Sequence, residues 1–172
     1  KKFGYPTKST EDIKDLVGKG AGALIGRSIW GQAKNEFSKV NNNKTKDDMI
    51  KEFIDFYGKN ILNESTLIKG VKKFLIWCKK ENISMAVCTN KTEHLAIDLL
   101  KKIGIYDYFE YVAGHNTFEY CKPDPRNLTT IIEILDGDTN KSLMIGDSET
   151  DANAAKAAEI PIILLENGYT EK

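Results

Sequence analysis

The sequence lacks the marks of two large classes of protein. Its longest apolar runs, such as residues 161–165 (PIILL), have the length of a β-strand, and none approaches the roughly 18 residues that a transmembrane helix needs. Lysine plus arginine and aspartate plus glutamate each number 25 among the 172 residues, so the chain has none of the basic surplus that is typical of nucleic-acid-binding proteins. We therefore expect a protein that neither spans a membrane nor binds nucleic acid.

Cysteine and histidine are also scarce. The three cysteines (Cys78, Cys88 and Cys121) lie far apart and include no CxxC pair, and the only histidines are His94 and His115. A structural zinc site needs several closely spaced nitrogen or sulfur ligands, so this inventory argues against one. Reduced thiols are typical of the cytoplasm, which is the location that we expect.

The chain changes character near residue 64. Residues 1–64 show helical patterns with no convincing strand, whereas residues 65–172 alternate short, β-branched apolar runs with helical segments. Unalternated strands bounded by helices are typical of a parallel sheet that helices cover on both faces. The pattern predicts an α/β fold with a doubly wound, Rossmann-like parallel sheet, preceded by a helical domain. The expected strands are residues 83–89, 111–113, 142–146 and 161–165.

Polar side chains follow the predicted strands at their carboxyl ends, where open parallel sheets bind ligands. Thr89 and Asn90 follow the first of these strands, Lys122 follows the second and Asp147 the third. A hydroxyl next to a helix N-terminus and a lysine ammonium are both suited to phosphate oxygens. Each residue also has an ordinary explanation, since Thr89 or Thr92 could merely cap the next helix and Lys122 could be a solvated surface lysine.

The segment 146–151 (GDSETD) places three acidic residues directly after a predicted buried strand. Like charges in a partly desolvated place repel one another, and a hard cation with oxygen ligands removes that repulsion. We expect Mg²⁺ to be bound by Asp147, with Asp151 supporting the site from outside the metal's direct ligands. Ser148 and Asp151 also fit the S-x-x-D pattern of a helix capping box, which would fix the loop that presents Asp147.

Together, these segments resemble the second, third and fourth motifs of the haloacid dehalogenase superfamily of phosphohydrolases. Thr89 matches the Ser/Thr of motif two, Lys122 the lysine of motif three, and residues 146–151 the acidic motif four. Four segments look most like those of the bacterial phosphoglycolate phosphatases: CTNK, CKPDP, GDSETDANAAKAAEIP and GYTE. The resemblance covers the whole chain, and it implies that residues 1–64 are the helical cap domain and residues 65–172 the α/β core of that superfamily.

The resemblance implies an Mg²⁺-dependent phosphatase of small phosphorylated metabolites, with 2-phosphoglycolate, converted to glycolate and phosphate, as the expected substrate. Thr89, Asn90 and Lys122 would bind the phosphate, Thr89 and Lys122 would act in catalysis, and Lys19 or Arg27 in the cap would meet the substrate carboxylate. The family's nucleophile is the aspartate of an Asp-x-Asp segment on its first strand, through which an aspartyl-phosphate forms. No such segment precedes the cap in this sequence, so we expect the core to lack its first strand, and its C-terminal end as well.

Other interpretations stay open at this point. A phosphate- or metal-binding module without catalysis would share the same residues, and another phosphatase, a pyrophosphatase or a phosphomutase would share the fold. We expect a monomer or a homodimer. The chain also departs from the family in two places: residues 114–116 read GHN where relatives usually read Gly-Gly-Asp, and Glu159 stands where glycine is common.

Overall fold

The computed structural model of the chain describes residues 3, 5, 7–9, 12, 13, 16, 20–30 and 43–166. The chain divides into two compact units, and the boundary between them falls between Asn60 and Ile61. The cap and core roles expected of residues 1–64 and 65–172 stay predictions. In the ranges that are described, no helix is long and apolar enough to cross a membrane.

The described part of the first unit centres on two helices that pack against each other, α2 (Ala21–Trp30) and α3 (Asn43–Lys59). Gly20 has a φ of 85° immediately before α2, a conformation that glycine adopts without steric cost. Gly22 of α2 faces Ile50 of α3, where a Cβ would make an ordinary contact at 3.8 Å from Cδ1 of Ile50. The aromatic rings of Phe53 and Tyr57, one turn apart on α3, stack with their centroids 6.0 Å apart.

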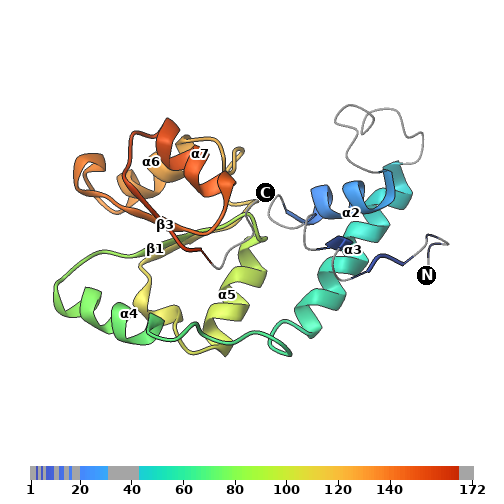
Figure 1. The fold of residues 1–172 in the computed structure, drawn as a ribbon, viewed down its shortest axis with the longest axis horizontal. Helices are drawn as coiled ribbons and strands as arrows, with labels where there is room; N and C mark the ends of the chain where they lie inside the picture. Colours follow the sequence, from blue (N-terminus) through green and yellow to red (C-terminus); the bar gives the residue numbers. More distant parts are fainter. Residues whose placement is uncertain are drawn as a thin grey trace. The chain divides into compact units, whose positions relative to one another are not determined.

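The second unit alternates helices and strands, as the sequence predicts. Its elements in order are α4 (Val71–Lys80), β1 (Ala86–Cys88), α5 (Glu93–Lys102), β2 (Tyr111–Ala113), α6 (Arg126–Ile134), β3 (Met144–Gly146), α7 (Glu149–Ala157) and β4 (Ile162–Leu164), with short 3-10 turns at Tyr106–Tyr108 and Thr139–Lys141. Helices α6 and α7 lie on one side of the strands and α4 and α5 on the other (Figure 1). The predicted α/β architecture is confirmed.

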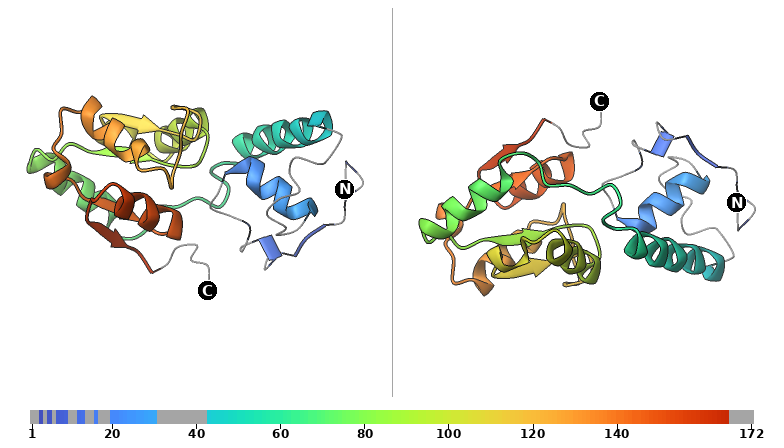
Figure 2. Two further views of the ribbon diagram at one scale, coloured as in Figure 1. Left: turned by 90° about the horizontal axis from the view of Figure 1, so that it is seen from above. Right: turned by 90° about the horizontal axis from the view of Figure 1, so that it is seen from below.

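The strands form two parallel pairs instead of the single sheet that the sequence leads us to expect. β1 pairs with β2, with Val87 opposite Val112, and β3 pairs with β4, with Ile145 opposite Ile163. Among the strands that the structure describes, β1 and β3 do not pair, so each has one edge without a ladder (Figures 1 and 2). The polar residues that follow the strands lie at this gap between the unpaired edges of β1 and β3.

Two apolar clusters support the strand pairs from opposite faces. The first contains Leu75 and Cys78 of α4 together with Met85 and Ile105, and the second contains Leu128 of α6 with Ala154, Ala155 and Ile160. The second cluster also contacts both β1 and β3 through Cys88 and Met144, so α6 and α7 hold the two strand pairs on a common layer. Burying a side chain of leucine size stabilises a fold by roughly 1.5–3 kcal/mol, so these contacts fix the frame of the site.

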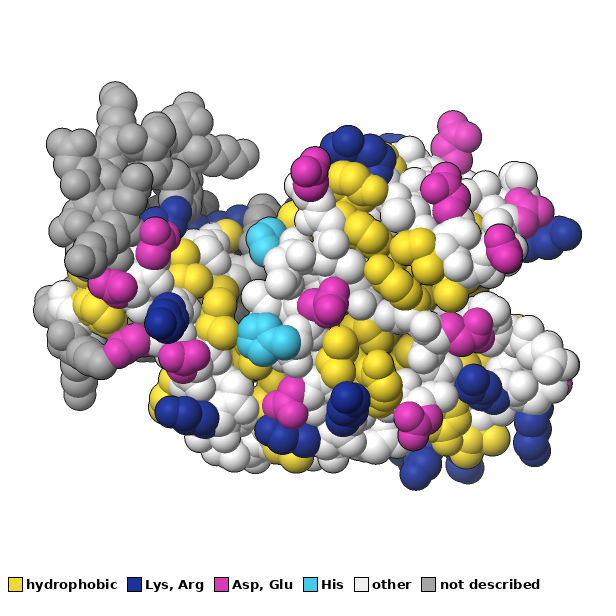
Figure 3. All heavy atoms as spheres, turned by 180° about the vertical axis from the view of Figure 1, so that it is seen from behind, with side chains coloured by type: hydrophobic (Ala, Val, Ile, Leu, Met, Phe, Trp, Pro, Cys, Tyr) yellow, Lys and Arg dark blue, Asp and Glu magenta, His cyan; other side chains and the backbone are white. Residues whose placement is uncertain are grey.

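Part of the second unit's apolar surface stays open. Ile145 of β3 and Ile163 of β4 are 40% and 49% exposed, although both lie in the middle of a strand. In the space-filling view, apolar side chains reach the surface among side chains of both charge signs (Figure 3). The strands β3 and β4 therefore lack cover on one face within the residues described.

Candidate active site

A pocket of about 270 Å³ lies between β1 and β3 in the second unit. Thr89 at the end of β1, Lys122 of the β2–α6 loop and Asp147 at the end of β3 all line it, and so does Asp151 of α7. These residues come from three segments that are far apart in the sequence. The structure therefore brings the predicted hydroxyl, ammonium and carboxylate groups to one small cavity, although their roles in chemistry stay predictions.

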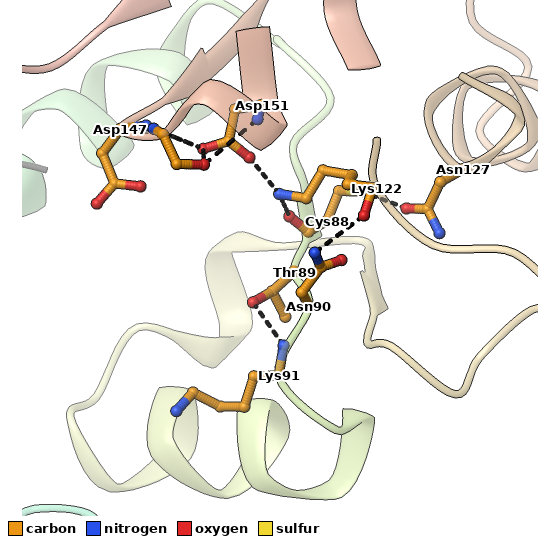
Figure 4. A network of polar contacts seen from close by, with 9 residues as sticks. Cys88, Thr89, Asn90, Lys91, Lys122, Asn127, Asp147 and Asp151 are labelled. Carbon is orange, nitrogen blue, oxygen red and sulfur yellow. Dashed lines mark hydrogen bonds and ion pairs between the residues drawn. The ribbon is translucent and has the colours of Figure 1, made fainter. Parts of the chain in front are cut away.

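Lys122 is buried and held by two acceptors (Figure 4). Its Nζ donates to Oδ1 of Asp151 at 2.6 Å and to the main-chain oxygen of Cys88 at the end of β1. The alternative of a solvated surface lysine is therefore wrong, because only 8% of the side chain is exposed. An ammonium has three N–H donors, so the one that these two bonds leave over can serve a ligand in the pocket.

Asp151 connects this lysine to the loop after β3. Its Oδ2 accepts hydrogen bonds from the main-chain N–H groups of Asp147 (3.0 Å) and Ser148 (3.1 Å) and from the Ser148 hydroxyl (2.8 Å). Ser148 Oγ in turn accepts from the Asp151 N–H, so the capping box is present at the start of α7. Both oxygens of Asp151 thus accept hydrogen bonds from the protein, and its expected role beside a metal ion stays a prediction.

The electrostatics of Asp151 reflect the same contacts. Burial acts to raise its pKa, but the charge of Lys122 and the hydrogen bonds from Lys122, Asp147 and Ser148 outweigh burial, so the pKa of Asp151 lies below its ordinary value. Gly146 makes the arrangement sterically possible, since a Cβ there would lie 2.5 Å from Cβ of Asp151. The carboxylate is thus ionised and packed directly on the end of β3.

Asp147 is half-buried, and its carboxylate points away from the Lys122–Asp151 pair (Figure 4). Burial, followed by the negative charge of Asp151, raises the pKa of Asp147 above its ordinary value. A cation at its oxygens would favour the ionised form, so the residue fits a metal ligand. In the described ranges, no three His, Cys, Asp or Glu side chains converge to hold a metal ion. A single carboxylate suits Mg²⁺, which usually keeps several waters and takes its other ligands from substrate phosphate.

Thr89 and Asn90 follow β1 directly. The Thr89 N–H continues the β1–β2 ladder to the oxygen of Ala113 at 2.9 Å, and its Oγ1 accepts from the N–H of Lys91 at 3.2 Å, which leaves its O–H as a donor at the pocket wall. Thr89 does not cap α5, because the N-cap residue of that helix is Thr92. Asn90 does not line the pocket; its Nδ2 donates to the main-chain oxygen of Lys122 at 3.0 Å, and its phosphate-binding role stays a prediction.

Two residues, Lys19 and Arg27, are expected to meet a substrate carboxylate. Arg27 lies in the last turn of α2 in the first unit, and its proposed role stays a prediction. Lys19 falls outside the residues that the structure describes.

Comparison with known proteins gives the family. The model of the haloacid dehalogenase-like hydrolases matches residues 1–165 of the 172. This chain belongs to that family. The expected fold class follows with it, because the structural neighbours share this α/β architecture.

The relatives of this haloacid dehalogenase-like chain include several phosphoglycolate phosphatases. The chain is 40% identical to the enzyme of Mesorhizobium japonicum over 126 residues (73% of this chain and 56% of the relative), and 36% identical to that of Agrobacterium fabrum over 161 residues (94% and 67%). A crystal structure described as a predicted phosphoglycolate phosphatase from Haemophilus somnus superposes with a TM-score of 0.87 at 26% identity, covering 98% of this chain and 75% of that one. The chain thus spans between about half and two thirds of the length of these curated relatives.

Two residues at or beside the pocket, Cys88 and Asn127, have no functional role in the sequence-based expectations. The thiol of Cys88 donates to Oδ1 of Asn127, and the Asn127 amide also reaches the loop that carries Lys122. An asparagine at the second position of a helix carries no pattern that marks it as part of a site. The only hint in the sequence is its place five residues after Lys122 in CKPDPRN.

Proposed function

We propose that this chain is the larger part of an Mg²⁺-dependent phosphatase that hydrolyses a small phosphomonoester, with 2-phosphoglycolate as the substrate. The observation that carries the proposal is the shared pocket, in which Thr89, Lys122 and Asp147 line one cavity of about 270 Å³. The names of the relatives, which are phosphoglycolate phosphatases at 32–40% identity, support the substrate.

The charge of the pocket supports the need for a divalent cation. Its charged lining residues are Lys122, Asp147 and Asp151, which give a net charge of −1 when both carboxylates are ionised. Such a pocket repels a phosphate dianion, and this repulsion is strong where solvent is partly excluded. One Mg²⁺ at Asp147 would make the pocket net positive and supply charge neutralisation at the phosphoryl oxygens. We infer that phosphate and Mg²⁺ bind together.

The chain's own residues would then position the phosphoryl group. The remaining Nζ–H donor of Lys122 and the O–H of Thr89 would each donate to a phosphoryl oxygen, and Asp151 would hold Lys122 in place through the 2.6 Å ion pair. Phosphoryl transfer depends chiefly on such positioning and on neutralising the charge of the equatorial oxygens. These donors are fixed before the substrate arrives, so little reorganisation is needed during the reaction.

The nucleophile would come from polypeptide outside residues 1–172. As the resemblance implies, it is an aspartate on a strand, and we propose that this strand lies between β1 and β3. Both flanking edges lack a ladder among the described residues, and the pocket lies along the same line. A parallel strand there would pair with both edges and bring its carboxylate beside Lys122 and Asp147. Attack by that carboxylate on phosphorus would release the alcohol and form an aspartyl-phosphate, which water then hydrolyses.

Hydrolysis of 2-phosphoglycolate by the full-length protein that contains this chain tests the proposal. Asp147→Asn and Lys122→Ala should each lower kcat by roughly 10²–10³-fold, the usual loss when one charge-stabilising group is removed. Asp98→Asn, which alters a surface aspartate of α5, is the matched control and should leave kcat unchanged. Turnover that survives in Lys122→Ala would remove the lysine from the mechanism. Mg²⁺-dependent phosphate binding without turnover of any phosphomonoester in a substrate panel would instead show a binding module.

A further inference from the structure

We propose that Asn127 is a positioning residue: its buried amide ties the loop that carries Lys122 to the end of β1 and thereby aims the lysine ammonium into the pocket. The inference rests on the proposed function, because it concerns the residue that would hold the phosphoryl group. Asn127 lies on α6 and does not line the pocket, so it would act only through Lys122.

The Asn127 side chain is 2% exposed and uses both ends of its amide. Its Oδ1 accepts the thiol hydrogen of Cys88, the last residue of β1, and its Nδ2 donates to the main-chain oxygen of Tyr120 at 3.1 Å. Tyr120 precedes Lys122 by two residues. One side chain therefore joins the strand and the loop between which the lysine reaches.

Together with a hydrogen bond from the lysine itself, these contacts close a ring, and Figure 4 shows its part through Asn127, Cys88 and Lys122. Lys122 donates from Nζ to the main-chain oxygen of Cys88, so Cys88 is held through its thiol by Asn127 and through its carbonyl by Lys122. Asn90 holds the main-chain oxygen of Lys122 at 3.0 Å from the other side. A lysine side chain has roughly 2 kcal/mol of rotamer entropy to lose, and a ring of this kind restricts it before any ligand binds.

An amide is the group that this position requires. Cys88 presents a donor and Tyr120 presents an acceptor, and only a side chain with both an acceptor and a donor satisfies the two at once. Burial raises the pKa of Cys88 to about 11, which keeps the thiol protonated and able to donate. Leucine, of similar volume, would leave the Tyr120 oxygen without this bond and release the loop.

Competitive amine labelling with mass spectrometry tests the inference without relying on turnover. Trace acetylation of the intact protein gives a rate for Lys122 relative to exposed Lys156 in the same sample. Asn127→Leu should raise the relative rate of Lys122 about tenfold, the factor that corresponds to losing one buried hydrogen bond. Thr130→Val, on the same helix as Asn127, is the matched control, because it removes the 2.7 Å contact between the Thr130 and Tyr120 hydroxyls but leaves both hydrogen bonds of the Asn127 amide intact. The relative rate of Lys122 in this variant should stay at the wild-type value.

Labelling of the thiol of Cys78, which is 3% exposed in α4, separates the loss of positioning at Lys122 from general unfolding. The inference holds if Lys122 becomes reactive while Cys78 stays protected, and it fails if the two rise together or if Lys122 does not respond. Cys88→Ala, which removes only the thiol donor, should act in the same direction and provides the test should Asn127→Leu not fold.

Titration with inorganic phosphate and Mg²⁺ distinguishes this inference from the proposed function. The wild-type protein should bind phosphate, Lys122→Met should not, and Asn127→Leu should bind about tenfold more weakly. If Lys122→Met loses phosphate binding but Asn127→Leu keeps full affinity for phosphate, only the positioning role is overturned. Unaltered affinity in Lys122→Met would instead overturn the proposed function.

Discussion

The buried ion pair between Lys122 and Asp151 leads to the sharpest prediction on stability. The two side chains are only 8% and 7% exposed, with Nζ and Oδ1 2.6 Å apart. Asp151→Asn removes the negative charge, leaves the ammonium buried beside a neutral amide, and disturbs the three hydrogen bonds that Oδ2 accepts from the loop after β3. The substitution thus changes one side-chain atom but affects both Lys122 and the loop after β3.

The expected magnitude follows from burial. Removing one partner of a buried pair destabilises a protein by about 3–5 kcal/mol, since the other charge stays desolvated. The chain contains a matched exposed pair, Lys102 with Asp98, at 2.8 Å and with 43% and 40% of the side chains exposed. For Asp98→Asn we expect a loss below about 0.5 kcal/mol, because solvent screens an exposed pair on a helix.

Urea unfolding of the two variants measures the difference. With a slope of about 2 kcal/mol per molar urea, a loss of about 4 kcal/mol lowers the midpoint by roughly 2 M. Lys122→Met combined with Asp151→Asn should lose less free energy of unfolding than the two single variants together, as coupled partners do. If Asp151→Asn and Asp98→Asn shift the midpoint equally, the pair is not desolvated in solution and the reasoning is refuted.

Three smaller predictions concern residues around the site. Gly114→Ala would place a Cβ 2.2 Å from the N of Glu93 at the start of α5. We therefore expect the free energy of unfolding to fall by about 1–3 kcal/mol and the melting temperature in calorimetry to fall by several degrees. An unchanged melting curve would argue against this close approach. Glu159→Gly should raise the melting temperature by roughly 2–4 °C, because Glu159 has a φ of 57° after α7, where glycine costs less; a lower value would contradict the strain. Because the pKa of Cys88 is raised to about 11, its thiolate fraction at pH 8 should be roughly 100-fold below that of an ordinary thiol; rapid alkylation of Cys88 by iodoacetamide in the folded protein would contradict this.

The order of elements in the second unit could be predicted from the sequence because short apolar runs and helical periodicity are local signals. The strand expected at residues 111–113 matches β2, and those expected at 142–146 and 161–165 appear as the shorter strands β3 and β4. Strand ends depend on pairing with a neighbour, which the local pattern does not contain. For the same reason, the local pattern does not predict the division into two strand pairs.

Three of the residues that line the candidate pocket could be predicted from the sequence, but the contacts between them could not. Thr89, Lys122 and Asp147 meet at one pocket, as their positions after successive strands suggest. The ion pair of Lys122 with Asp151 joins residues 29 apart, and nothing local indicates which acid the lysine meets. The close packing of Gly146 against Asp151 and the ring of hydrogen bonds through the Asn127 amide also arise only from tertiary contacts.

We propose that Thr89, Lys122 and Asp147 surround one phosphoryl group paired with a divalent cation. A crystal structure of the full-length protein with Mg²⁺ and tungstate, a heavy phosphate analogue that anomalous scattering locates without ambiguity, tests it most directly. We predict the anion within hydrogen-bonding distance of Lys122 Nζ and Thr89 Oγ1, with the metal on the Asp147 carboxylate. An anion bound elsewhere, or a metal that avoids Asp147, would contradict the account.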